Sequence, residues 1–249
     1  MRKIVILILA GLLSAHTGAQ NRLRLSEAKN RLRLSEAKNP DNTKAESRWK
    51  VGVAVGYTNN SYSMNNSYQS DWQQSNRGGV AVGLTGQYNF VDWFGVRMDL
   101  QWMQRNYRNS RALVVDKYNY TNDYLQIPLV ADFSFGGKKL RGFFDAGVYG
   151  GCWLSSRVKG MGTNVFHALD ATLEPISQSG MIDSRRDNRM VFGYVGGMGL
   201  EYRFLPQWSC QVECRYFYDA TSQVKQYQAI KDYRYNGTLV IQAGAAYHF

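Results

Sequence analysis

Eight segments of the chain alternate apolar and polar side chains with a period of two residues. They cover residues 49–57, 80–90, 94–102, 125–135, 143–154, 192–204, 208–218 and 239–249. A period of two places successive side chains on opposite faces of a β-strand. Each segment is close to the ~9–11 residues that a tilted strand needs to cross a bilayer. The pattern predicts an all-β protein whose strands each have one apolar face.

Charge is confined to one face of these predicted strands. The charged residues opposite the apolar face are Lys50, Arg97, Asp99, Asp132, Asp145, Glu201, Arg203, Glu213 and Arg215. In residues 143–154 both faces are apolar or small, so Asp145 alone decides the register. The apolar face of a soluble sandwich or lipocalin-like barrel points inward, whereas that of a membrane barrel points to lipid and must exclude charge. The polar face is also rich in glycine, which suits a narrow lumen better than a solvated surface.

The links between the strands alternate in length. Three are short, at residues 91–93, 136–139 and 205–207, and four are long, at residues 59–78, 107–123, 155–190 and 219–237. Short periplasmic turns and long extracellular loops are typical of bacterial outer-membrane barrels. We therefore expect an eight-stranded antiparallel transmembrane β-barrel with four long extracellular loops and both termini in the periplasm.

Aromatic residues cluster at both ends of the predicted strands. Those at the short-turn end are Trp49, Phe90, Trp93, Phe94, Phe135, Phe204, Trp208, Tyr247 and Phe249. Those toward the long loops are Tyr57, Trp102, Tyr124, Tyr194 and Tyr218. Two such groups match the aromatic girdles of bilayer interfaces. Within the fourth strand Pro128 cannot donate a ladder hydrogen bond, so we expect a β-bulge there.

The residues before Trp49 have a different character. Residues 1–19 combine a basic start, a short apolar run and small residues at the end, which predicts a signal peptide cleaved after Ala19. Residues 20–48 then form a basic periplasmic tail in which nine residues, NRLRLSEAK, occur twice. Two copies fall short of the roughly three that a stacked array needs, so we interpret the repeat as a tolerated duplication. The barrel is predicted to occupy residues 49–249.

The formal net charge of +11 suggests an acidic partner, and the predicted export limits which acidic partners the protein can meet. An exported chain without a recognisable nucleic-acid module is not expected to bind nucleic acid. Attraction to the acidic headgroups of outer-membrane lipid or to polymers of the cell envelope is the better physical explanation. The predicted location is the outer membrane of a Gram-negative cell.

The chain has three cysteines, Cys152, Cys210 and Cys214. Cys210 and Cys214 lie four residues apart on one predicted strand, which separates them by roughly 13 Å. A disulfide needs Cα atoms within about 7 Å. We expect these cysteines to be buried small apolar residues.

Several motifs resemble those of a known family. They are YLQIPL at residues 124–129, GYVGGMGLEY at 193–202, RY at 215–216 and AYHF at 246–249. With these motifs, residues 49–249 resemble the PorT-like outer-membrane β-barrel family of Bacteroidetes-type bacteria. The resemblance implies an eight-stranded barrel that is sometimes an accessory of secretion or surface assemblies. Phe249, with Tyr247 two residues before it, resembles the C-terminal signal that the outer-membrane assembly machinery reads.

The charged residues of the polar face are expected to share the lumen. This candidate lumen network consists of Arg97, Asp99, Asp132, Asp145, Glu201, Arg203, Glu213 and Arg215. Eight strands leave an interior that side chains just fill, and buried charges must pair. The network is therefore predicted to be a paired plug, and the alternative is a narrow gated channel for ions or small solutes.

The sequence offers little for catalysis. No metal-ligand motif and no cofactor motif occurs, so neither a metal nor a cofactor is expected. A second alternative is a lipid-modifying enzyme of the outer membrane, which would need a nucleophile and a base near the outer rim. His167 in the third long loop, near Asp170 and Ser155, is the only candidate for the base. A solvated loop histidine is the simpler interpretation, and we do not expect an enzyme.

The long loops remain as the place for function. The first is rich in Asn, Ser, Gln, Tyr and Trp, which suits contact with a protein or glycan partner. In the third, Phe166, Leu169 and Leu173 have helical spacing, so either a short amphipathic helix or a self-packed loop is expected. The sequence thus predicts a non-enzymatic structural or accessory protein that contacts partners through its extracellular loops.

Overall fold

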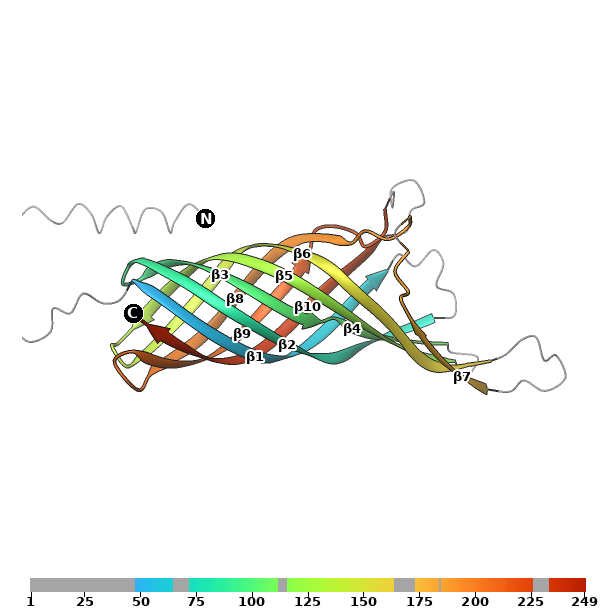
Figure 1. Ribbon diagram of the computed structural model, residues 1–249, viewed down its shortest axis with the longest axis horizontal. Coiled ribbons are helices and arrows are strands. Elements are labelled where there is room, and N and C mark those ends of the chain that lie inside the picture. The colour runs from blue at the N-terminus through green and yellow to red at the C-terminus, as the bar shows by residue number, and fades with distance from the viewer. Residues whose placement is uncertain (1–47, 65–71, 112–115, 164–172, 184, 226–232) are drawn as a thin grey trace, which may run out of the picture. The chain divides into compact units, whose positions relative to one another are not determined.

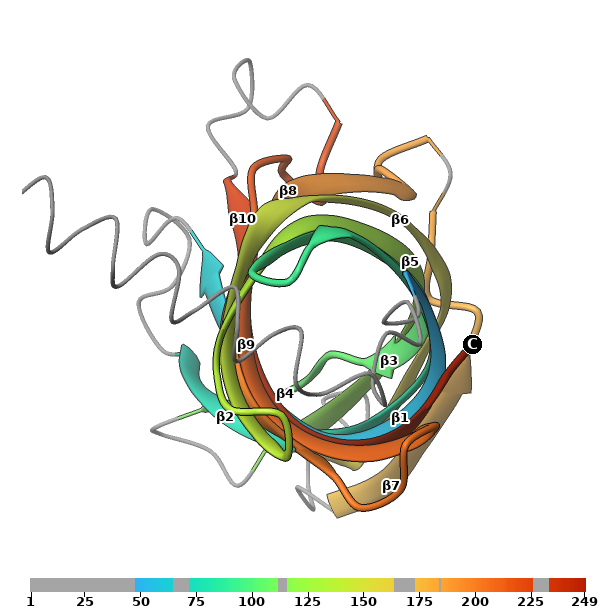
Figure 2. The ribbon, with the colours of Figure 1, turned by 90° about the vertical axis from the view of Figure 1, so that its left-hand side faces the viewer.

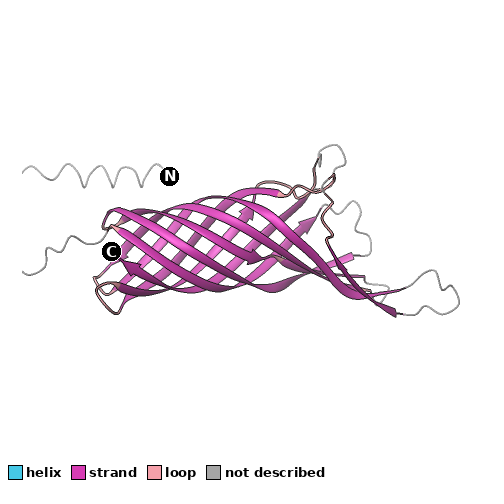
Figure 3. Ribbon diagram, in the orientation of Figure 1, coloured by secondary structure: helices cyan, strands magenta, loops and turns pink. Residues whose placement is uncertain are grey.

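The computed structural model describes residues 48–64, 72–111, 116–163, 173–183, 185–225 and 233–249. These residues are mostly in strands (Figure 3), and no helix among them is long and apolar enough to cross a membrane. The predicted signal peptide and the nine-residue repeat lie outside the described residues.

Ten antiparallel strands form one closed sheet (Figure 2). They are β1 (Trp49–Met64), β2 (Trp72–Val91), β3 (Phe94–Gln104), β4 (Asn106–Arg111), β5 (Lys117–Gly136), β6 (Leu140–Thr163), β7 (Leu173–Ser179), β8 (Met190–Arg203), β9 (Trp208–Asp219) and β10 (Arg234–His248). β3 and β4 lie end to end, and together they occupy one strand position in the barrel wall, between β2 and β5. Only Arg105 separates them. β7 and β8 likewise both pair with β6, one after the other. The predicted eight-stranded antiparallel barrel is therefore confirmed.

The two ends of the barrel differ, as Figure 1 shows. The short turns between β2 and β3, β5 and β6, and β8 and β9 lie at the same end as the C-terminus. At the other end the strands run well beyond their predicted limits: β1 continues to Met64, β2 starts at Trp72 and β6 reaches Thr163. Much of the predicted loops 59–78, 107–123 and 155–190 is therefore strand. Outside the bilayer the outer face no longer has to be apolar, so the ladder continues where the hydrophobic alternation stops.

The outer face of the wall is apolar and exposed. Val53, Leu84 and Met198 have exposed fractions of 56%, 57% and 69%, whereas Arg97 and Glu213 point inward and are each 1% exposed. This arrangement is the inverse of a water-soluble protein, and only a lipid environment accommodates it. Asp145 gives the correct register for β6, because it is buried and its neighbour Phe144 faces outward.

Tyr124 corrects the predicted aromatic girdle. The other four residues of the extracellular group are exposed on the outer face or are partly exposed. Tyr124, in contrast, is only 1% exposed. It precedes the outward-facing Leu125, so alternation points its ring into the barrel, where it stacks on Trp153 with a centroid distance of 5.8 Å. The register of β5 against β6 also shifts here, between Asp123 and Tyr124.

The expected bulge at Pro128 is absent from the described ladders. β3 and β5 keep one register from Met98 opposite Leu129 to Gln101 opposite Gln126, so neither strand carries an inserted residue at Pro128. The two pairings in between are missing from the ladder. The proline therefore interrupts the pairing without shifting it, since it lacks the N–H that a ladder hydrogen bond needs.

Two further expectations are corrected. Cys210 and Cys214 are unpaired, as predicted, but they are exposed on the outer face rather than buried, and Cys152 is partly exposed. Their apolar thiols face lipid because every second residue of these strands does. Leu173 begins strand β7, so it is not helical, and the rest of the proposed amphipathic helix lies outside the described residues.

A charge placed on the lipid-facing surface tests the position of the bilayer. Val53→Arg puts an arginine on the apolar part of β1 and should lower the free energy of unfolding by about 2–4 kcal/mol. Ser61→Arg, on the same face of β1 but beyond the apolar belt, should change it by less than about 1 kcal/mol. Urea unfolding in lipid vesicles measures both, and equal effects of the two substitutions would contradict the assigned membrane boundary.

Candidate functional site

Five charged residues form a central cluster in the middle of the lumen. They are Arg97, Asp99, Asp145, Glu213 and Arg215, and each is at most 5% exposed. Arg97 forms ion pairs with Asp145 and, at 2.6 Å, with Glu213. Arg215 forms ion pairs with Asp99 and, through Nε at 2.5 Å, with Glu213. The cluster thus joins β3, β6 and β9, which are not neighbours in the wall, across the lumen.

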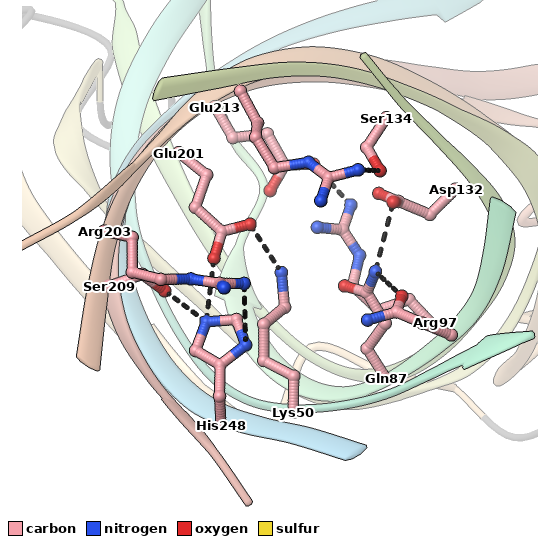
Figure 4. A network of polar contacts seen from close by, with 12 residues as sticks. Lys50, Gln87, Arg97, Asp132, Ser134, Glu201, Arg203, Ser209, Glu213 and His248 are labelled. Atoms are coloured by element: carbon pink, nitrogen blue, oxygen red, sulfur yellow. Dashed lines mark hydrogen bonds and ion pairs between the residues drawn. The ribbon is translucent and has the colours of Figure 1, made fainter. Parts of the chain in front are cut away.

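A second group of polar residues, the periplasmic cluster, is shown in Figure 4. It lies near the short turns, because the backbone N–H groups of His248 and Arg203 donate to the carbonyls of the turn residues Gln207 and Lys139. Glu201 accepts hydrogen bonds from Lys50 Nζ at 3.1 Å and pairs with His248 Nε2 at 3.0 Å. Ser209 Oγ lies 2.9 Å from the same histidine nitrogen. Arg203 is half-buried, and its guanidinium lies 3.5 Å from His248 Nδ1. This cluster ties β1, β8, β9 and β10 together at the end where the chain closes the ring.

Asp132 belongs to neither cluster. Gln87 Nε2 donates a hydrogen bond to its carboxylate at 3.1 Å (Figure 4). All eight residues of the candidate lumen network therefore point into the barrel, but they form two clusters and one separate carboxylate rather than a single group.

A third group, the extracellular cluster, was not predicted. Arg105 NH1 forms an ion pair with Asp219 at 2.6 Å, and Tyr149 donates its hydroxyl proton to the same carboxylate. The Arg105 guanidinium also lies over the Tyr124 ring, 4.8 Å from its centroid. Both residues could have been found by continuing the alternating pattern past the predicted strand ends. Arg105 is an even number of residues from Arg97, and Asp219 from Arg215, so each falls on the same inward face.

Amide side chains connect the extracellular cluster to the central one. Arg105 donates to Gln126 at 2.8 Å, Gln126 to Gln101 at 3.1 Å, and Gln101 to Gln242 at 3.0 Å. Gln242 then donates to Glu213 Oε2 at 2.9 Å. A continuous line of hydrogen bonds therefore runs along the lumen, as buried polar groups require.

The central cluster keeps unused hydrogen-bonding capacity. Among the described residues, Asp99 Oδ1, Asp145 Oδ1 and Arg215 NH2 are buried and have no hydrogen-bond partner. Three carboxylates also face only two guanidinium groups, which gives the cluster a formal charge of −1 when all are ionised. The buried charges are thus largely, but not completely, compensated.

Two loop segments cover the extracellular end of the lumen, and we call them the mouth cap. They are residues 180–183 with 185–189, and residues 220–225, and a β-bridge between Asp187 and Val224 joins them. Val224 is 1% exposed, and Gln223 donates a 2.6 Å hydrogen bond down to the Tyr124 hydroxyl. The hydrogen bond from Arg186 to Asp187 raises the pKa of the Arg186 guanidinium above its ordinary value.

The residues considered for the enzyme alternative and those of the predicted assembly signal lie at different ends of the barrel or outside the described residues. Ser155 donates its hydroxyl proton to Asp123 at 2.7 Å, whereas His167 and Asp170 lie outside the described residues. Within the described part of the chain no group of three or more His, Cys, Asp or Glu side chains is arranged to hold a metal ion. Tyr247 contacts Trp208 and Phe249 edge to face, and Phe249 is 69% exposed at the periplasmic end.

Gly197 makes room for the central cluster, which a substitution can test. A Cβ at this position would lie 2.7 Å from Arg215 Cγ and 3.0 Å from both Asp145 Oδ1 and the Cys214 carbonyl oxygen. Arg215 is held by its ion pairs and cannot easily move, so Gly197→Ala should lower the free energy of unfolding by about 1–3 kcal/mol. Gly196→Ala, whose Cβ would meet only the Asp145 carbonyl oxygen at 3.7 Å, is the matched control and should change it by less than about 0.5 kcal/mol. Urea titration of the refolded barrels provides the measurement, and equal destabilisation by both would refute this role of Gly197.

Comparisons with known proteins found solved structures of similar barrels. Curated proteins gave no match to the chain. The solved structure of the outer membrane protein OprG from Pseudomonas aeruginosa is 14% identical, with a TM-score of 0.50 over 84% of this chain and 99% of that one. Neisserial surface protein A is also 14% identical, with a TM-score of 0.44 over 83% of this chain and 100% of that one. At these identities the likeness to OprG concerns the fold alone.

A family model described as the outer membrane protein beta-barrel domain matches residues 19–218, well over half of the chain. The closed eight-stranded ring, its apolar outer face and its charged lumen agree with this match. The chain belongs to the outer membrane β-barrel domain family and is a protein of the outer membrane.

Proposed function

We propose that the protein is a non-enzymatic, closed barrel that acts as a structural or accessory component of the outer membrane and contacts a partner protein outside the cell. The single observation that carries this proposal is the pairing of charged side chains inside the lumen. Its charged side chains come from opposite walls and bind one another rather than lining an open path. The PorT-like resemblance agrees with an accessory role, because some members of that family serve secretion or surface assemblies.

The surface for the partner is the extracellular part of β5, β6 and β7, which we call the projecting sheet. Lys117 of β5 lies opposite Met161 of β6, and Thr163 of β6 lies opposite Leu173 of β7, so three paired strands extend beyond the ring (Figure 1). A sheet held by ladder hydrogen bonds loses less conformational entropy on binding than a free loop does. β7 is also an edge strand, with β6 as its only described neighbour.

Export and assembly belong to the same proposal. Residues 1–19 act as a cleaved signal peptide and residues 20–48 as a basic periplasmic tail. Tyr247 and Phe249 form the signal that the assembly machinery reads, which agrees with the outward exposure of Phe249 at the end of the chain. Ser155, which was considered only for the enzyme alternative, donates a hydrogen bond to the Asp123 carboxylate, which favours a structural role for it.

A narrow gated channel is the second candidate function. The observation that favours it is the set of buried, unpartnered atoms on Asp99, Asp145 and Arg215. Such atoms could exchange partners if the central cluster rearranged. The paired arrangement favours the closed barrel, because separating a buried ion pair costs several kcal/mol, on the order of 3–5.

Site-specific crosslinking in cells tests the contact with a partner. A photo-reactive residue at Met161, which is 43% exposed on the projecting sheet, should yield one stoichiometric crosslinked protein. The same residue at Met198, 69% exposed on the lipid-facing wall, is the control and should yield none. If neither crosslinking nor purification in mild detergent recovers a stoichiometric partner, the accessory function is wrong.

A further inference from the structure

Basic side chains gather on the outward face of the barrel just beyond the lipid-facing wall. Arg108 of β4 and Arg157 and Lys159 of β6 are exposed there, and we call these three residues the basic band. Lys159 lies opposite Asn119 of β5, which in turn lies opposite Arg108, so the two cations share one face of the sheet. Val158, between the two cations of β6, is 3% exposed and faces the lumen, so Arg157 and Lys159 both point outward.

The residues beneath the basic band fix its height above the bilayer. Leu154 is 48% exposed and is the last apolar residue on the lipid-facing part of β6, level with the aromatic girdle where Trp102 lies opposite Leu125. Arg157 and Lys159 follow Leu154 by three and five residues, which is about 7 and 12 Å along the membrane normal for a strand tilted by roughly 45°. The headgroup layer is about 5–8 Å thick on each side. Both long side chains can therefore reach the layer where outer-leaflet lipids carry their phosphates.

The charges of the basic band are only partly compensated. Arg157 NH2 forms an ion pair with Asp123 at 3.0 Å, but the arginine side chain is still 52% exposed. Arg108 Nε donates a hydrogen bond to Asn119 at 2.8 Å. Among the described residues, no carboxylate pairs with Arg108 or Lys159. With Asp123 counted, the band has a formal charge of +2.

Asp123 holds Arg157 in place without using up its hydrogen-bonding capacity. The carboxylate is fixed by Ser155, which donates at 2.7 Å, and by Gln104 Nε2 at 3.2 Å, and its side chain is only 10% exposed. A guanidinium has five N–H donors, so Arg157 keeps donors for a second acceptor. Arginine binds phosphate oxygens in pairs, and a lysine beside it adds a point charge. The basic band therefore suits a phosphate better than it suits a neutral group.

We propose that the basic band binds the phosphate groups of lipopolysaccharide in the outer leaflet. The acyl chains of such a glycolipid lie on the apolar wall around Leu154 and Leu125, and this position brings its phosphates to the band. A soluble anion would gain only the electrostatic part of this interaction. An acidic protein segment would have no reason to prefer the cations nearest the bilayer. The site lies between the bilayer and Met161, where the partner surface is tested, so it does not depend on the accessory function.

Native mass spectrometry of the refolded full-length barrel, released from micelles that contain bisphosphorylated lipid A, tests the proposal. Lipid A should remain bound, and the same lipid without its phosphates should bind at least about tenfold more weakly. Arg157→Gln and Lys159→Gln should each weaken the binding of lipid A about fivefold, because a cation near an anionic lipid surface contributes roughly 1 kcal/mol.

Lys117→Gln is the matched control. Lys117 is exposed on the same face of the same sheet, opposite Met161. It is eight residues beyond Leu125, which places it about 19 Å above the girdle along the membrane normal. Charges separated by more than the ~10 Å screening length interact weakly, so this substitution should change the binding of lipid A by less than about twofold.

Lys159→Gln also guards against misfolding, because the Lys159 side chain forms no hydrogen bond or ion pair with a described residue. The proposal is overturned if lipid A binds equally well with and without its phosphates, or if Lys159→Gln leaves binding unchanged. Equal weakening by Lys117→Gln and Lys159→Gln would also overturn it, since that result indicates a soluble anion or an acidic protein. Lipid A binding without a crosslinked partner would refute only the accessory function, and a crosslinked partner without lipid A binding would refute only the lipid site.

Discussion

The structure depends on how charges are compensated inside a narrow ring of eight strands. A buried guanidinium or carboxylate is tolerated only when it is paired and hydrogen-bonded. Arg97 and Arg215 meet this requirement with carboxylates from three strands that are not neighbours. The ion pairs therefore act across the lumen, where the backbone ladder cannot, and they close the interior while they stabilise it.

The same requirement explains where the protein can offer a binding surface. Below the mouth cap, inward side chains pair with one another along the amide line from Arg105 to Glu213. On the outside, lipid covers the apolar wall. What remains is the extracellular end, where paired strands continue beyond the bilayer and where the stacked rings of Tyr62, Tyr107 and Tyr120 line a cavity. Function is therefore expected above the membrane rather than through it.

The wall could be predicted from the sequence because the bilayer imposes a strict pattern on it. Alternation assigned the faces correctly, and Asp145 alone gave the register of β6. The extracellular extensions could not be found in this way, since their outer face meets water and loses its apolar pattern. Nor could the sequence show which charges form ion pairs. Arg97 and Glu213 lie far apart along the chain and meet only because the strands close into a ring. Tyr124 was misassigned because strand parity, and not only position near a strand end, decides whether an aromatic ring faces lipid.

Electrical recording from the refolded protein in planar lipid bilayers tests the closed lumen most directly. A barrel held shut by the central cluster should show no steady conductance above the bare membrane, in either polarity of the applied voltage. A steady conductance of the unmodified protein that changes when Arg215 is replaced by alanine would contradict the account, because it would show that ions pass through the cluster.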